Sequence, residues 1–384
     1  MPELAEVARV VHYIRKYLVG KAITKVHVQD DPIVYGKVGT TAAEFKKHME
    51  GKTIVDSGQQ GKYFWIIMSS PPHPVMHLGM TGWLKVKNVD SHYSRTSAPE
   101  NGEAQWPPKF WKFMLQVDDV SKTEAAFVDA RRLSRVRLID CPGPDIRKYT
   151  PLKENGPDPI LDKDIMTLDW LKKKLASKKV PIKALLLDQA NISGLGNWMG
   201  DEILYHAKIH PEQYCNTIPE AQIEQLYSAI NYICSTSVDL LGNSEQFPAD
   251  WLFKYRWGKG KKNHSQQLPN GEKVVFITVG GRTSAVVPAV QKKTGPVAGD
   301  AHDVATEVDE PPPKKKRGNT AKKESTAAEN DDEGTSTKRA TIRKPKAEPT
   351  VKSEKQANSR KQKVAPQTET PTVPKHGRSL RSRK

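Results

Sequence analysis

Hydrophobic residues recur at helical spacing directly behind the start of the chain. Leu4, Val7, Val10, Val11, Ile14 and Leu18 fall on one face of a helix. From about residue 21 to 147 the pattern changes to short apolar runs separated by Gly, Pro, Asn and Asp. The runs are ITKVHV, TIVDS, YFWIIM, VMHLGM, WLKV, FMLQV, AAFV and SRVRLI. They predict an antiparallel β-sandwich or barrel that follows an N-terminal helix.

Helical spacing returns between about residues 150 and 242. Apolar residues there predict four helices, centred on Leu171, Leu186, Ile203 and Ile230. The segment NISGLGN lies between the second and the third, and Asn197 stands where a helix N-cap is expected. Farther on, the runs KVVFITV and SAVVPAV, joined by GGRT, predict a hairpin with Arg282 at its tip.

Composition divides the chain into four parts. We expect a β-rich domain at 1–149, a helical domain at 150–249, a hairpin at 250–290 and a tail at 291–384. The tail has no Phe, Tyr or Trp, and its 23 Lys and Arg against 13 Asp and Glu give it a net charge of +10. Such a segment cannot bury enough apolar area to offset its chain entropy, so we expect it to be disordered. The predicted fold is therefore α+β and multidomain.

The net charge of the whole chain is +17, which predicts a polyanionic partner, nucleic acid first. No apolar run reaches membrane-spanning length, so no membrane is expected. The tail clusters PPPKKKRG, KRATIRKPK and RSLRSRK are typical of nuclear import signals or phosphate binders, and we expect the protein in the nucleus. The three cysteines are far apart and the histidines lack metal-binding spacing, so neither metal nor other cofactor is expected.

The first residues, MPELAEV, carry unusual chemistry. Removal of Met1 would expose the secondary amine of Pro2, and an α-amino group has a pKa near 8, so part of it is free base at neutral pH. Such an amine can attack an electrophilic sugar carbon, and the iminium that forms is an electron sink. Glu3 stands next to it as a proton donor or acceptor.

Four further residues each have an ordinary structural explanation when taken singly. Lys62 reads as a strand-edge lysine, Asn197 as a helix cap, Arg282 as a solvated turn residue and Met80 as a turn residue between two glycines. Each also fits DNA. A helix N-terminus preceded by glycines binds phosphate, a guanidinium grips a phosphate bidentately, and an apolar side chain on a turn can enter the base stack.

Taken together, six motifs resemble one family. MPELAEV, GKYFWI, HLGMTG, DARRLSRVRL, SGLGNWMGDEIL and GGRTSAVVP occur in the order and approximate spacing of the formamidopyrimidine-DNA glycosylase and endonuclease VIII family, over about residues 1–290. The resemblance implies a bifunctional DNA glycosylase and AP lyase. Its substrate would be double-stranded DNA with an oxidised base or an abasic site, and we expect it to act as a monomer.

The resemblance also implies roles for particular residues. Pro2 would be the nucleophile, Glu3 would transfer a proton at the sugar ring oxygen, and Lys62 would hold a phosphate and assist the reaction. Arg282 would complete the catalytic set as the finger arginine and grip a phosphate together with Asn197 of a helix-two-turn-helix motif. The residues expected to fill the gap left by the extruded nucleotide are Met80, Arg131 and Leu133. Lys112, in FWKFML, falls where another DNA contact is expected.

The chain departs from the bacterial pattern in three places. Residues 251–290 contain none of the four cysteines of the bacterial zinc finger and resemble the zincless finger of plant and fungal members. The second proline of the start motif is Ala5 here. The segment before the finger does not match the loop that folds over 8-oxoguanine, so we expect formamidopyrimidines and hydantoins to be better substrates than 8-oxoguanine.

Two other classes of function stay open from the residues alone. A non-catalytic DNA-binding or chromatin protein of the same fold would bind without forming an imine. An N-terminal-proline tautomerase would need neither the high positive charge nor the Asn197 and Arg282 motifs.

Overall fold

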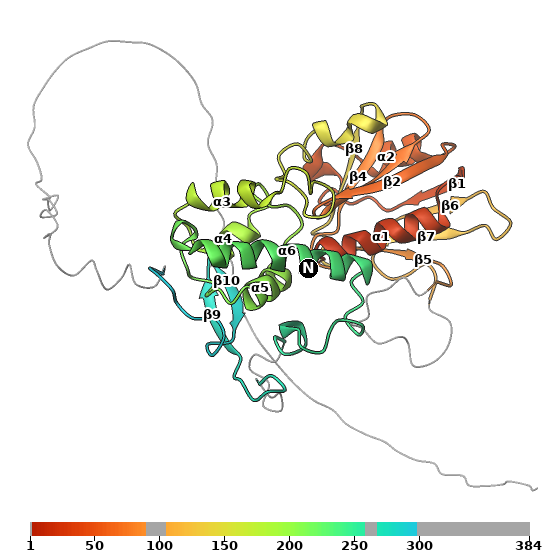
Figure 1. Cartoon of the computed structure of the whole chain (residues 1–384). Helices are drawn as coiled ribbons and strands as arrows, with labels where there is room; N and C mark the ends of the chain where they lie inside the picture. The colour runs from red at the N-terminus through yellow and green to blue at the C-terminus, as the bar shows by residue number, and fades with distance from the viewer. Residues whose placement is uncertain (1, 90–104, 258–266, 298–384) are drawn as a thin grey trace, which may run out of the picture. The chain divides into compact units, whose positions relative to one another are not determined.

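The computed structural model describes residues 2–89, 105–257 and 267–297 (Figure 1). Its α-helices are α1 Leu4–Tyr17, α2 Ala42–Met49, α3 Leu168–Ala176, α4 Ile182–Leu187, α5 Asn197–His206 and α6 Glu220–Asp239. Its strands are β1 Ile23–Val28, β2 Ile54–Gln60, β3 Tyr63–Met68, β4 His73–His77, β5 Trp83–Val86, β6 Trp111–Val117, β7 Glu124–Val128, β8 Arg135–Ile139, β9 Val275–Val279 and β10 Arg282–Val286. Short 3-10 turns are η1 Gly36–Val38, η2 Gly143–Lys148, η3 Cys215–Thr217 and η4 Leu252–Lys254.

The first eight strands form two antiparallel sheets, ordered β1-β6-β7-β5 and β2-β3-β4-β8. Both contribute to a single core, in which Val26 and Phe113 of the first sheet join Phe64 and Met76 of the second. In β6, the buried Phe113, Leu115 and Val117 alternate with the less buried Met114 and Gln116, whereas β1 does not follow a strict alternation. The predicted antiparallel sandwich behind an N-terminal helix is confirmed.

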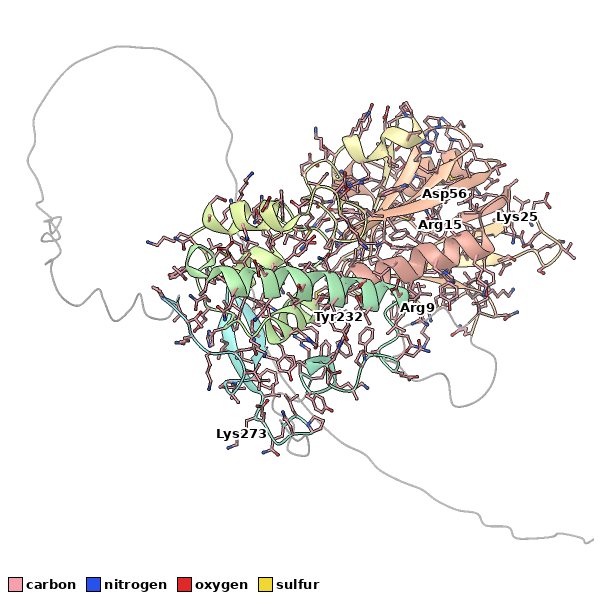
Figure 2. The ribbon with its side chains drawn as sticks, viewed as in Figure 1. Arg9, Arg15, Lys25, Asp56, Tyr232 and Lys273 are labelled. Carbon is pink, nitrogen blue, oxygen red and sulfur yellow. The ribbon has the colours of Figure 1, made fainter. Side chains whose placement is uncertain are left out.

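Helix α1 belongs to both halves of the molecule. Val7 and Ile14 are buried in the core of the sheets, whereas Leu4 is buried in the core of the helical part. Figure 2 shows Arg15 near Asp56 of β2, and their ion pair is 3.0 Å long between Nε and Oδ1. Helix α1 is thus packed on two sides, and Pro2 lies two residues before the start of this fixed helix.

The helical part contains α3 to α6 around a second core, and the hairpin β9–β10 lies beside α5 (Figure 1). All four helices predicted from the spacing are present. The expected start of the tail at residue 291 is wrong by several residues. Gln291 and Val297 are buried, and Gln291 Nε2 donates to the Ile209 carbonyl at 3.0 Å. The side-chain amide of Gln291 bonds to the backbone and so holds this segment, and a count of aromatic residues does not reveal such a contact. The rest of the predicted tail, from residue 298, lies outside the described residues.

Three further features complete the fold. Helix α2 was not predicted, although Thr41 caps it by accepting from Glu44 N at 3.1 Å. Cys141, Cys215 and Cys234 are free and buried. In the described ranges, no helix combines the length and apolar character that a membrane crossing needs.

Candidate active site

The N-terminus is fixed by three hydrogen bonds to the first turn of α5 and the loop before it. Leu4 N donates to the Gly194 carbonyl at 3.1 Å, and the buried Glu3 carboxylate accepts from Trp198 N and Met199 N, each at 3.1 Å. A carboxylate at a helix N-terminus is stabilised by free N–H groups and the helix dipole. Glu3 therefore joins the two halves and holds Pro2 next to the start of α5.

Gly196 makes this approach possible. A Cβ atom at Gly196 would lie 2.2 Å from the Glu3 carboxyl carbon, which is far inside contact distance. The second glycine of SGLGN is therefore required by the close approach of Glu3. Asn197, in contrast, does not cap α5: the helix begins at Asn197 itself, Gly196 is the cap residue, and the free N–H groups bond to Glu3 instead. The predicted cap was wrong because the capping side chain comes from the other end of the sequence.

Glu6 is a second buried carboxyl group beside the N-terminus. Its Oε2 accepts from Glu3 N at 2.9 Å. Burial raises the pKa of Glu6 to about 7, and the neighbouring Glu3 charge acts in the same direction. Near neutral pH this group is divided between its acid and its carboxylate, so it can exchange a proton within the site. Sequence reasoning did not single it out, although it lies one helical turn from Glu3.

Lys62 is brought to the same place by the turn between β2 and β3. Gly61, at a φ of +57°, packs against Ser193 and Gly194, and its N–H donates to Asp158 Oδ2 at 2.7 Å. Lys62 itself is buried. Burial lowers the pKa of its ammonium and Arg282 adds to this effect, whereas the Glu3 and Glu6 charges oppose it. Lys62 is thus a buried amine whose protonation is affected by the charges of both carboxyl groups and of Arg282.

Arg282 reaches the site from the hairpin. Gly280 and Gly281 form the turn, both at positive φ, and Arg282 is the exposed first residue of β10. Asn197 Nδ2 donates to the carbonyl of the following residue, Thr283, at 2.8 Å. Asn197 Oδ1 is buried and has no partner in the described structure. The structure therefore joins the Asn197 and Arg282 segments, which are 85 residues apart in the sequence.

The three residues expected to fill the DNA stack lie on two adjoining loops. Met80 and Leu133 expose 40% and 38% of their surface, which is unusual for large apolar side chains, and Arg131 is exposed as well. A Cβ at Gly79 would lie 2.5 Å from the Leu133 backbone carbon, so the two loops touch. The loops thus present two apolar side chains and one guanidinium to solvent.

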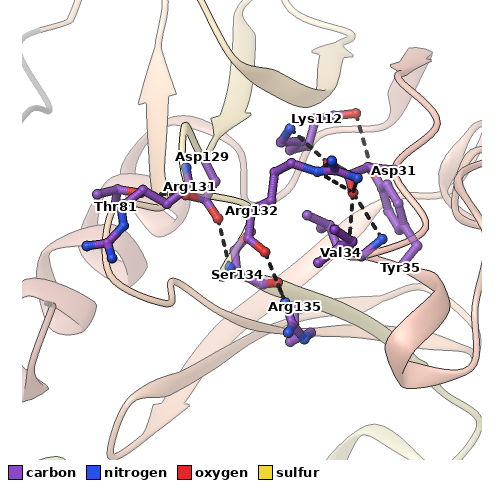
Figure 3. A network of polar contacts seen from close by, with 11 residues as sticks. Asp31, Val34, Tyr35, Thr81, Lys112, Asp129, Arg131, Arg132, Ser134 and Arg135 are labelled. Carbon is purple, nitrogen blue, oxygen red and sulfur yellow. Dashed lines mark hydrogen bonds and ion pairs between the residues drawn. The ribbon is translucent and has the colours of Figure 1, made fainter. Parts of the chain in front are cut away.

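Asp129 holds both loops, as Figure 3 shows. Its Oδ1 accepts from Thr81 Oγ1 at 2.6 Å and from Arg131 N at 3.1 Å, and its Oδ2 accepts from Ser134 N at 2.7 Å. Although burial opposes it, these hydrogen bonds lower the pKa of the Asp129 carboxyl. No sequence signal marks this role, because a single aspartate after a strand is typical of any turn.

Lys112 has a structural partner. Its ammonium lies 2.9 Å from Asp31 Oδ2, and the guanidinium of Arg132 binds the same carboxylate (Figure 3). Although burial opposes it, the hydrogen bonds from Arg132 and Lys112 hold the pKa of Asp31 well below its usual range. Lys112 is buried in this pair and shares the carboxylate of Asp31 with Arg132, the residue between Arg131 and Leu133. A direct contact of Lys112 with DNA stays a prediction.

The side chains brought together around Pro2 are acids, a lysine and an arginine. These groups are suited to amine chemistry and to phosphate binding. Within the ranges described, no group of three or more His, Cys, Asp or Glu side chains is arranged to hold a metal ion.

Comparison with known proteins agrees with this geometry. The family model of the formamidopyrimidine-DNA glycosylase N-terminal domain matches residues 1–136, and that of the H2TH domain of the same enzymes matches residues 155–248. Formamidopyrimidine-DNA glycosylase of Arabidopsis thaliana is 39% identical over 295 residues, which cover 77% of this chain and 72% of the relative. The chain belongs to the formamidopyrimidine-DNA glycosylase family.

Solved structures of the family extend the similarity to three dimensions. The enzyme from Lactococcus lactis, non-covalently bound to DNA that contains an AP site, has a TM-score of 0.60 and 26% identity over 76% of this chain and 100% of its own. A structure of MutM with DNA containing carbocyclic 8-oxo-G has a TM-score of 0.59 and 25% identity. The formamidopyrimidine-DNA glycosylase of Pelotomaculum thermopropionicum is 29% identical over 99% of its length and 76% of this chain. Each of these relatives is matched over 99% or more of its own length and covers 76% of this chain.

The candidate site contains residues from both domains matched by the family models. Pro2, Glu3 and Lys62 lie in the N-terminal domain, and Asn197 lies in the H2TH domain. Arg282 lies beyond both domain models. Its position therefore depends on how the hairpin is attached to the rest of this chain.

Proposed function

We propose that this protein is a bifunctional DNA glycosylase and AP lyase that excises oxidised bases from double-stranded DNA through an imine at Pro2. The observation that supports this most strongly is the position of Pro2. The residue sits directly before a helix buried on two sides, beside the carboxyl groups of Glu3 and Glu6, while Lys62 is buried at the adjoining turn. Nucleophile and proton carriers thus come from one rigid cluster.

In the first step, the free-base nitrogen of Pro2 attacks C1′ of the damaged nucleotide. The C1′–N bond to the base breaks, the base leaves with its bonding electrons and takes up a proton, and the Pro2 nitrogen loses its own proton. Glu3 is placed to transfer a proton to the sugar ring oxygen, after which the C1′–O4′ bond breaks and an iminium forms. The pKa of Glu6 near 7 lets it accept or return a proton in the same neighbourhood.

In the lyase steps, the iminium withdraws electrons from the sugar. Loss of a C2′ proton expels the 3′ phosphate, and loss of the C4′ proton then expels the 5′ phosphate. Water hydrolyses the imine and frees the amine. Arg282 and Asn197 hold the phosphates, and the lowered pKa of Lys62 increases the share of its amine that is unprotonated and free to take up a proton. We expect formamidopyrimidines and hydantoins ahead of 8-oxoguanine as substrates.

The damaged nucleotide has to leave the base stack to reach Pro2. Extrusion costs a few kcal/mol in lost stacking and pairing. Met80 and Leu133, both exposed on touching loops, provide apolar surface to fill the gap, and Arg131 can pair with the orphaned base. The opposing view, a DNA-binding protein without catalysis, gives no role to the buried Glu6 and Lys62 beside the amine.

Borohydride trapping tests the proposal. Untagged protein is incubated with a duplex that contains one guanidinohydantoin or one abasic site, then reduced, and wild type is compared with Pro2→Gly. We expect a covalent protein–DNA band that requires Pro2. Two further proteins serve as controls, one with a short tag at its N-terminus and one with the same tag at its C-terminus. Only the N-terminal tag blocks the amine of Pro2, so only that protein should fail to form the band. Tight binding without any band would support the non-catalytic alternative.

We further propose that the basic clusters of the tail direct the protein to the nucleus. The support is compositional: PPPKKKRG and KRATIRKPK are short runs rich in Lys and Arg. Imaging of a C-terminal fluorescent fusion tests it. Replacement of residues 314–317 by alanine should move the fusion toward the cytoplasm, and an unchanged nuclear signal after both clusters are replaced would contradict the proposal.

A further inference from the structure

The hairpin that carries Arg282 is small, and something has to fix it. Strands β9 and β10 pair over five residue pairs, from Arg282 with Val279 to Val286 with Val275. An isolated two-stranded hairpin is marginally stable in water. Residues 251–290 contain no cysteine, so no thiolate cluster holds these strands together. The attachment has to come from the helical domain.

Asp201 of α5 lies where that attachment is made. Its side chain is fully buried. Its Oδ1 accepts from Lys183 Nζ of α4, and its Oδ2 accepts from Arg256 Nη2 at 2.6 Å and Nε at 3.2 Å. The same Oδ2 accepts from the backbone N–H of Ala285 in β10 at 3.1 Å. One carboxylate thus joins a helix, the segment after η4 and the hairpin.

Two more contacts place the hairpin on the same helices. Gly280 of the hairpin turn packs against Ala184, the residue that follows Lys183. A Cβ atom added at Gly280 would lie 3.2 Å from the Ala184 Cβ. Asn197 donates to the Thr283 carbonyl, next to Arg282. Together with Asp201 at Ala285, these contacts hold the turn and the first four residues of β10, which is the part of the hairpin that carries Arg282.

A buried carboxylate with two cations tolerates little change in geometry. Each charge removed from water is costly unless its partners are in place, so a shifted β10 would leave charged groups unpaired in the core. Arg256 is fixed in addition by Trp257, whose ring centroid lies 4.4 Å from the guanidinium carbon. The register of β10 against α5 is therefore coupled to the arrangement of these three charges.

We propose that Asp201, paired with Lys183 and Arg256, is the positioning centre for Arg282 and performs in this chain the anchoring that a metal ion performs in a metal-bearing finger. Asp201 does not touch DNA. It acts through the backbone of β10, three residues from the arginine. The proposal rests on the proposed function only in that Arg282 contacts a phosphate of the substrate.

Arg256→Gln is the variant of choice. It removes one charge from the network while Lys183 continues to neutralise Asp201, so the domain is expected to fold, whereas Asp201→Asn would leave two buried cations without a counter-charge. The matched control is Lys21→Gln, which removes an ion pair of 2.6 Å with Asp119 in the sheet domain. Both variants lose one Lys or Arg charge, but only the first should affect the hairpin.

Hydrogen–deuterium exchange tests the anchor without reference to activity. In Arg256→Gln we expect the amides of 275–286 to exchange on the order of tenfold faster, because local opening of the hairpin becomes easier, while those of β3 and β6 stay unchanged. Unchanged exchange in 275–286 would overturn the proposal. This arm stands even if the protein proves not to cleave DNA.

A double-mutant cycle tests the connection to Arg282. We expect Arg256→Gln to lower kcat/KM on a lesion duplex about tenfold when Arg282 is present and less than about twofold in the background of Arg282→Ala, since coupled residues are not additive. Equal losses in both backgrounds would mean that the network acts on the fold alone and would overturn the proposal. If the wild type forms no imine and cuts no DNA, the proposed function fails, and the exchange experiment alone decides the anchor.

Discussion

Glu3 shows how one side chain can serve structure and chemistry together. Its carboxylate accepts the first free N–H groups of α5, and its own N–H is accepted by Glu6. The group proposed to transfer a proton to the sugar is therefore held by backbone donors on one side, and the nucleophile precedes it directly. The position of Pro2 depends on a helix that begins about 195 residues away in the sequence.

At the scale of a residue, Glu6 predicts a pH dependence of stability. Its pKa in the fold is about 7, above the ordinary value of 4.5, so the folded state holds the proton more tightly than the unfolded state does. The stabilisation is fully present below about pH 4.5 and is lost as the pH rises through about 7, by roughly 3 kcal/mol. Urea unfolding of Glu6→Gln across this range should show a smaller decrease of unfolding free energy with pH than wild type. Parallel curves for the two proteins would contradict the assignment.

At the scale of elements, a comparison of two glycine turns distinguishes the effect of backbone conformation from that of a close contact. Gly61 and Gly51 both have positive φ, but only Gly61 faces another backbone, with Gly194 N 2.7 Å from its would-be Cβ. We expect Gly61→Ala and Gly51→Ala both to cost roughly 1–2 kcal/mol of stability from the backbone conformation. Only Gly61→Ala should also displace Lys62 and lower kcat, on the order of 10–100-fold. Comparable activity of the two variants would show that the contact is not needed.

The loops that carry Met80 and Leu133 give a second prediction at this scale. Asp129→Ala removes the acceptor of Arg131 N and Ser134 N, and each buried donor left unpaired costs roughly 1–3 kcal/mol. We expect lower thermal stability and faster amide exchange in 78–82 and 131–134, together with slower cleavage of a lesion duplex. The control is Asp118→Ala, since Asp118 is exposed on a turn of the same domain. An Asp129 variant with the exchange pattern of this control would argue against the network.

Elements with a strong local pattern could be predicted from the sequence. Strands β1, β3 and β5 match the runs ITKVHV, YFWIIM and WLKV in full, because β-branched and aromatic residues bounded by turn residues define them locally. Helix α2 was missed because its eight residues lie among strand signals. The pairings of Asp201 with Arg256 and of Lys112 with Asp31 could not be predicted, since the partners lie 55 and 81 residues apart in the sequence. Pairings of this kind are determined by the fold.

At the scale of the whole molecule, we expect the tail to contribute to DNA binding but not to the catalytic step. Residues 298–384 carry 21 Lys and Arg against 13 Asp and Glu, a net charge of +8, and family relatives matched over 99% and 100% of their own length cover only 76% of this chain. We expect a protein ending at 297 to keep kcat at saturating substrate and to bind undamaged DNA more weakly. Its log Kd should change less steeply with log salt, by about 0.9 for each phosphate that the shortened protein no longer neutralises. Equal salt slopes for both forms, measured by fluorescence anisotropy, would exclude a contribution of the tail.

The buried cysteines have a consequence for an enzyme that repairs oxidative damage. Burial raises the pKa of the Cys215 thiol to about 12 and also raises those of Cys141 and Cys234. Peroxide attacks the thiolate form, so all three side chains are poor targets for oxidation to sulfenic acid. The proposed catalytic groups are an amine, carboxylates, a lysine and an arginine, none of which needs a reduced sulfur atom. The proposed chemistry therefore does not depend on the oxidation state of these cysteines.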